Sequence, residues 1–117
     1  MQVEIVGGLS VRATEDLLAS TGLQGHAIED ERVEREPVLA TIAAIVGITG
    51  TSLTVAEKVY AWYKKWRAPQ PHTPIEPGVQ RVLIASRDGR RLFLEDATIE
   101  DLRKIIEENR SYADSSS

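Results

Sequence analysis

The residue types that most often carry out chemistry are sparse in this chain of 117 residues. It has no cysteine, which excludes a disulfide framework, a thiolate zinc site and a cysteine nucleophile. Its two histidines, His26 and His72, lie in polar segments without a second ligand at helical spacing, so a zinc site is not expected. The pair Gly7-Gly8 lacks the further glycines and the lysine of phosphate-binding loops, and no serine lies in a nucleophile elbow. The sequence therefore predicts a protein that is not an enzyme, with no catalytic residues, metal or cofactor.

Charge sets a second limit on function. The chain has a formal net charge of −4, and its first 37 residues hold eight acidic and three basic groups. Nonspecific nucleic-acid binding depends on neutralising phosphates, so no nucleic-acid partner is expected for an acidic chain. Arg87, Arg90 and Arg91 crowd one turn, where they are expected to be solvated or to hold a phosphate or an acidic partner.

The elements that must position these groups form one α+β domain over residues 1–113, with a disordered tail at 114–117. The expected class is a small mixed sheet in the order β-α-β-α-β-β-α, with helices packed on one face. Thr98 and Asp101 have the spacing of a capping box at the start of the last helix. The expected elements are a strand (2–6), a helix (11–20), an edge strand (26–34), a long hydrophobic helix (38–67), an extended proline-rich linker (68–78), a β-hairpin (81–95) and a closing helix.

The long helix is the unusual feature of this prediction. Residues 38–56 carry no charge, and 19 helical residues extend about 28 Å, enough to cross the hydrocarbon core of a bilayer. A second interpretation buries the helix in protein or pairs it with copies of itself. Ala43, Gly47 and Thr51, spaced by four, would then allow close helix contact. A true span would separate the first strand from the hairpin, which leaves each half too small to fold well.

Two segments are candidates for binding a partner protein. The first is the aromatic and basic end of the long helix, with Tyr60, Trp62, Tyr63 and Trp66. The second is the hairpin, in which Asp88-Gly89 predicts a two-residue turn. That turn pairs Ile84 with Phe93 and makes both hairpin faces apolar, so either the long helix or a partner must cover the second face. The residues of this second face are Val82, Ile84 and Phe93.

The order of these features resembles a known family. The residues that carry the resemblance are Val3-Glu4-Ile5-Val6-Gly7-Gly8, the Ala-, Gly- and Thr-rich run that continues into Ala61-Trp62-Tyr63-Lys64-Lys65-Trp66, and the hairpin from Arg81 to Leu92. Together with the closing helix, they are similar to the effector-associated constant component domains of bacterial conflict systems. The resemblance implies a small non-catalytic component encoded beside an effector, either protease-like or centred on an NTPase.

Two functions therefore remain open. The first is an adaptor in the cytoplasm that binds a nearby-encoded effector or forms a homo-oligomer. The alternative is a single-span or membrane-inserting protein anchored by residues 38–56. Apolar surface beyond the needs of one small core favours the first, and the uncharged run favours the second.

Overall fold

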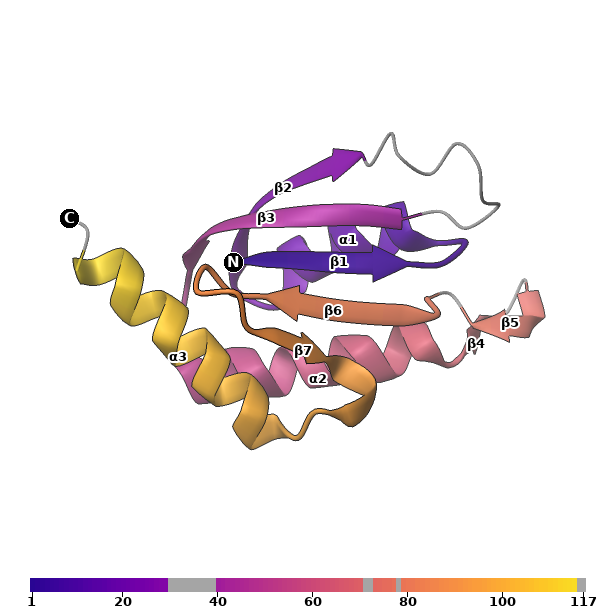
Figure 1. Cartoon of the computed structure of the whole chain (residues 1–117). Coiled ribbons are helices and arrows are strands. Elements are labelled where there is room, and N and C mark those ends of the chain that lie inside the picture. Colours follow the sequence, from indigo (N-terminus) through magenta and orange to yellow (C-terminus); the bar gives the residue numbers. More distant parts are fainter. Residues whose placement is uncertain (30–39, 71–72, 78, 116–117) are drawn as a thin grey trace.

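An antiparallel sheet and three helices form the fold. The computed structural model describes residues 1–29, 40–70, 73–77 and 79–115 (Figure 1). The elements are β1 (Gln2–Val6), α1 (Ser10–Ser20), β2 (Leu23–Glu29), β3 (Ala40–Ile48), α2 (Ser52–Arg67), β4 (Pro69–Gln70), β5 (Thr73–Pro77), β6 (Arg81–Ala85), β7 (Arg91–Phe93), the 3-10 turn η2 (Leu94–Asp96) and α3 (Ile99–Ser115).

The main sheet has five strands in the order β2-β3-β1-β6-β7. Its class is α+β, as predicted. The expectation of a mixed sheet is wrong, because β1 runs antiparallel to both β3 and β6 and the two outer pairs are antiparallel as well. The expected element order is also wrong, because it lacks β3, β4 and β5.

The expected helix over residues 38–67 is wrong in its first half. Residues 40–48 form β3, which lies between β1 and β2, and only Ser52–Arg67 are helical. The side chain of Thr51 accepts a hydrogen bond from the backbone N–H of Thr54 at 3.2 Å, which caps the start of α2. The membrane interpretation of residues 38–56 depended on that helix. Among the described residues, no helix is both long enough and apolar enough to cross a bilayer.

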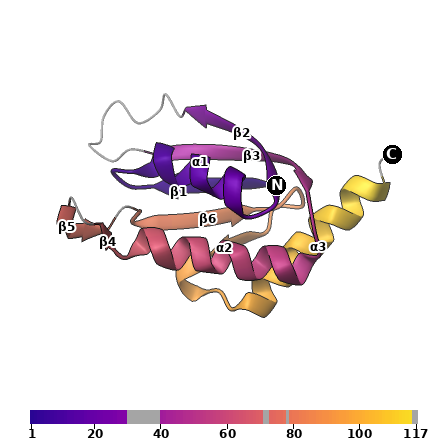
Figure 2. The same cartoon turned by 180° about the vertical axis from the view of Figure 1, so that it is seen from behind.

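Helices α1 and α2 lie against one face of the sheet, and α3 packs mainly against α2 (Figure 1). In the view from behind, α1 and α2 lie in front of the strands, and α3 runs past the end of α2 (Figure 2). The core contains Leu17 of α1, Val59 of α2 and Ile106 of α3, each at most 1% exposed. On the sheet, Val3 and Ile84 are paired across β1 and β6 and point into this core.

The hairpin forms as predicted, but its turn is one residue longer. Ser86 donates its backbone N–H to the carbonyl of Arg90 at 2.9 Å, which encloses a three-residue loop. Gly89 has φ +91°, which few residues other than glycine adopt. The longer loop shifts the register, so that Leu83 pairs with Phe93 and Ile84 with Leu92.

Three smaller predictions, for the linker, the edge strand and the tail, can also be compared with the structure. The segment expected to be an extended linker contains β4 and β5, which pair with each other, and β5 ends at Pro77. The edge strand expected over 26–34 overlaps β2 at residues 26–29, and residues 30–34 lie outside the described part. His72 also lies outside the described part. The tail expected to be disordered begins inside α3, which ends at Ser115, while residues 116–117 lie outside the described part.

Candidate partner-binding surface

The face of the sheet opposite α1 and α2 is the candidate surface, and it faces the viewer in Figure 1. Because side chains alternate along a strand, every second residue of each strand points to this side. We call this surface the open face. It consists of Gln2, Glu4, Val6, His26, Ile28, Ala40, Ile42, Ala44, Val46, Arg81, Leu83, Ala85, Arg91 and Phe93.

A row of large side chains crosses the middle of the open face. The strand registers place one residue of each strand side by side, and four of the five residues are apolar. At the two ends of the row, Ile28 is 42% exposed and Phe93 is 37% exposed. From β2 to β7 the row is Ile28, Ile42, Glu4, Leu83 and Phe93. A row that is apolar in four of five positions on one side of a sheet is unusual where that side stays in water.

Small residues form a flatter area beside this row. Ala44, Gln2 and Ala85 are neighbours across β3, β1 and β6. Together with Met1 and Arg87 they line a shallow hollow of about 310 Å³. Alanine side chains at these positions allow another protein surface to come close to the backbone of the sheet.

A β-bulge adds a further exposed apolar group. The register between β2 and β3 shifts after Gln24, and Val46 has no partner residue in the ladder. Its side chain is 71% exposed. Gly25 lies at the same bulge, and a Cβ atom there would come within 1.9 Å of the Ala44 carbonyl oxygen, so a larger residue does not fit.

The charges of the open face are separated from one another. Glu4 lies in the middle, between Ile42 and Leu83. The Arg81 guanidinium lies 6.0 Å from the centre of the Phe93 ring, in a cation–π contact. Within the described part of the chain, Glu4 has no ion-pair partner, and neither has Arg81. If the open face is covered, the Glu4 carboxylate must therefore gain a partner from the covering surface.

Of the three hairpin residues predicted to bind a partner, only Phe93 lies on the open face. Val82 and Ile84 are each 1% exposed and belong to the core, so their prediction as binding residues is wrong. The physical reason is the register of the hairpin. The three-residue loop places Phe93 beside Leu83 instead of Ile84 and thereby puts it on the other side of the sheet.

Two of the four aromatic residues of α2, Trp62 and Trp66, hold that helix to α1. Trp62 is 3% exposed and donates its indole N–H to the Ala13 carbonyl at 2.8 Å. Tyr63 is also buried, while Tyr60 and Trp66 are partly buried against the core. Trp62 and Tyr63 are therefore not accessible to a partner in this fold, while partner binding by Tyr60 and Trp66 stays a prediction.

Trp66 extends the same contact at the end of α2. It donates its indole N–H to Asp16 Oδ2 at 2.8 Å, and Lys65 Nζ lies 3.4 Å from the same oxygen. This part of α2 thus belongs to the helix-to-helix packing.

The row predicted for helix self-association does not form. Ala43 lies in β3 and is fully buried, and Gly47 lies in the same strand beside the Gln24 side chain. Thr51 is the cap of α2. Because the first two residues are in a strand, the spacing of four does not place them on one helix face.

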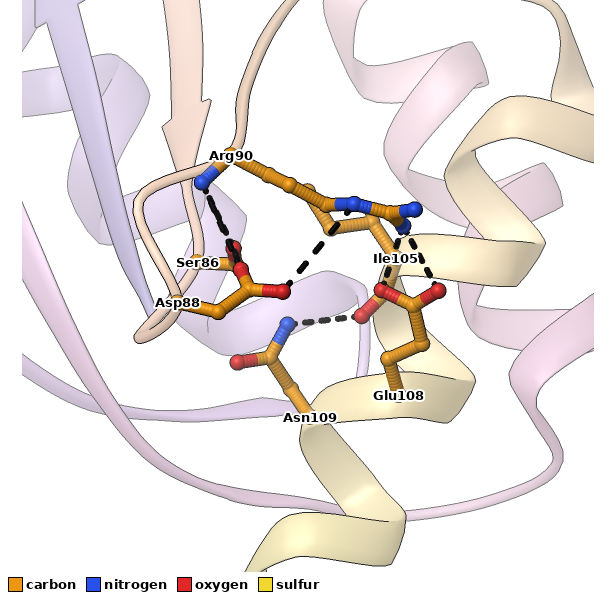
Figure 3. Close-up of polar contacts among 6 residues, drawn as sticks. All are labelled: Ser86, Asp88, Arg90, Ile105, Glu108 and Asn109. Carbon is orange, nitrogen blue, oxygen red and sulfur yellow. Dashed lines mark hydrogen bonds and ion pairs between the residues drawn. The ribbon is translucent and has the colours of Figure 1, made fainter.

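The hairpin turn packs against α3 through polar groups (Figure 3). Arg90 donates from Nη1 to both carboxylate oxygens of Glu108, at 2.6 and 2.7 Å. The pKa of Asp88 lies below its usual range, mainly because its carboxylate accepts a hydrogen bond from the Ser86 hydroxyl and, with a smaller effect, one from the Arg90 backbone N–H. Asn109 donates to the Ile105 carbonyl at 2.6 Å. These groups therefore have partners within the turn and α3.

A shallow hollow of about 280 Å³ lies at this turn, lined by Ser86, Arg87, Asp88, Glu108 and Asn109. Both carboxylates of the hollow interact with Arg90, which fits a structural role. Within the residues that the structure describes, no group of three His, Asp or Glu side chains is placed to hold a metal ion.

Comparisons with known proteins add no family. A scan against protein-family models gives no match, and searches of curated proteins and of solved structures give no significant match. The resemblance to effector-associated constant component domains stays a prediction.

Four residues of the central row were not predicted from the sequence as binding residues: Glu4, Ile28, Ile42 and Leu83. The signal that could have found Ile42 is the enrichment of residues 41–49 in β-branched side chains, which favours a strand. Once residues 40–48 form a central strand, its partners β1, β2 and β6 bring the other three residues into one row.

Proposed function

We propose that this chain is a non-catalytic interaction component that works by protein–protein contact, with an effector protein or with copies of itself. The open face is the observation that supports the proposal. Its central row is apolar in four of five positions, and no helix lies over it in the described part of the chain. A small domain that keeps such a surface in water risks nonspecific association, so a dedicated protein partner is the economical explanation.

The resemblance supplies the kind of partner. In the family that the chain resembles, the component is encoded beside a protease-like or NTPase-centred effector, and its contribution is recruitment or restraint of that effector. We propose the same relation here. The polar groups at the hairpin turn fit this view, because Arg90, Asp88 and Glu108 interact with one another instead of facing a reactive centre.

Co-purification with the neighbouring effector tests the proposal. The chain and the effector encoded beside it are expressed together and separated by size-exclusion chromatography. We expect a complex that is lost with Ile28→Glu, which places a charge at the end of the apolar row. Val11→Glu is the matched control, since Val11 is similarly exposed at 49% but lies on α1. Absence of a complex, or equal binding by both variants, would count against the proposal.

A further inference from the structure

The open face carries its own complementary charges. Glu4 pairs with Leu83 across β1 and β6, and Val6 pairs with Arg81 two residues further along. These four residues are the corners of one rectangle in the ladder, with the apolar pair on one diagonal and the charged pair on the other. Within the described chain, Glu4 and Arg81 form no ion pair with each other or with another group.

We infer that the protein covering the open face is a second copy of this chain, related by a two-fold axis along the Val6–Leu83 diagonal. This inference rests on the proposed function in using the same face, and it names the partner that covers this face when no effector is bound. In projection, a two-fold axis along that diagonal carries each of the other two corners to within about 3 Å of the other's position, given strands about 4.8 Å apart and alternate residues about 6.8 Å apart. It therefore places Glu4 of each copy opposite Arg81 of the other. Because the dimer is symmetric, this contact occurs twice and gives two ion pairs.

The apolar groups fit the same axis. Val6 and Leu83 lie on it, so each meets the same residue of the other copy. Arg81 is already held over the Phe93 ring at 6.0 Å, and a guanidinium that stacks on a ring can still receive a carboxylate at its edge. With strands about 4.8 Å apart and alternate residues about 6.8 Å apart, the strands of the two copies cross at about 70°, close to orthogonal sheet packing.

The size of the face indicates a weak and reversible dimer. A strand residue covers about 16 Å² of sheet, so the five strands give a flat area on the order of 500 Å². Standard protein interfaces use roughly 800 Å² of accessible surface from each partner, and smaller ones are weak and transient. We therefore expect a reversible dimer with a dissociation constant on the order of 10 µM.

Charge reversal and exchange test this arrangement. Sedimentation velocity is measured from about 1 µM to about 1 mM, which brackets the expected dissociation constant. Glu4→Arg and Arg81→Glu should each weaken the dimer at least about tenfold, because like charges then face each other across the axis. The double variant Glu4→Arg/Arg81→Glu should return the dissociation constant to within about threefold of the original. Glu57→Arg and Lys58→Glu, both exposed on α2, are the matched controls and should change nothing.

A cross-link provides a measurement that does not depend on charge. Because the chain has no cysteine, Leu83→Cys introduces a single thiol, and this thiol lies on the proposed axis. A short bis-maleimide should join two copies through this thiol, whereas Val11→Cys on α1 should give monomers only. Circular dichroism confirms that each variant is folded.

The outcomes separate this inference from the proposed function. A chain that stays monomeric over the whole range overturns the inference, and so does a dimer that Glu4→Arg leaves unchanged. In either case the co-purification of the effector still decides the proposed function. A dimer that is broken by single reversals and restored by the double variant supports the inference, even if no effector binds.

Discussion

Truncation of two adjacent residues of β6 tests which side of the sheet is core and which is open. Ile84 is 1% exposed, whereas Leu83 beside it is partly exposed on the open face. Ile84→Ala removes three buried carbon atoms, worth about 2.5 kcal/mol of transfer free energy at about 0.8 kcal/mol each. The cavity left behind raises the loss of unfolding free energy to about 3–4 kcal/mol. For Leu83→Ala we expect a loss of about 1 kcal/mol, because water already reaches that side chain.

Urea denaturation of dilute protein measures both losses. With a slope of about 1.5 kcal/mol per molar, the midpoint should fall by about 2 M for Ile84→Ala and by less than about 1 M for Leu83→Ala. Equal losses, or a larger loss for Leu83→Ala, would refute the assignment of the two faces. That result would also return Ile84 to the list of partner-binding candidates.

Three further perturbations test the packing. Trp66→Phe removes the hydrogen bond to Asp16, and we expect it to cost about 1 kcal/mol in urea denaturation and almost nothing when Asp16 is already alanine. A hydrogen bond from the Thr98 N–H lowers the pKa of Asp101, so its contribution to stability is present above the unfolded-state value of 3.8 and is lost as the pH falls through the lower folded value. Carbon-detected NMR titration should therefore place Asp101 below 3.8, and a normal value would contradict the cap. Gly25→Ala should lower the melting midpoint by more than about 8 °C, since its Cβ would overlap a carbonyl, whereas Gly8→Ala, with open space around it, should not.

The sequence predicted the elements that have strong local signals. The alternation in β1, the apolar pattern of α1 and the Asp-Gly turn of the hairpin each depend on neighbours in the chain. The capping box is confirmed as well, since Thr98 receives the Asp101 N–H at 3.1 Å and donates its own N–H to Asp101 at 3.0 Å. Where interactions between residues close together in the chain decide the structure, a single sequence was sufficient to predict the element.

β3 could not be identified with the same certainty, because an uncharged apolar run satisfies two structures. Residues 40–48 fit a buried helix and a central strand equally well in hydrophobicity. The decision depends on β1 and β2, which pair with this strand on both sides. Ala43 illustrates the point, since its small side chain suits a helix and is in fact buried at the centre of a sheet.

The candidate surface was missed for a related reason. A register that differs by one residue moves a side chain to the opposite face. The extra residue in the hairpin loop moved Phe93 away from Ile84, and the position of Glu4 between Ile42 and Leu83 depends on β3 being a strand. The residues of a sheet that can bind a partner can be identified only after the registers of all its strand pairs are known.

Methyl NMR spectra of the chain across a dilution series test the central claim most directly. We expect concentration-dependent shifts for the methyl groups of Leu83 and Val6 on the open face, and none for Val82 and Ile84 in the core. Spectra in which no methyl group shifts, or in which the shifts lie on the exposed side chains of α1 and α2, would contradict the claim that the open face binds a second copy.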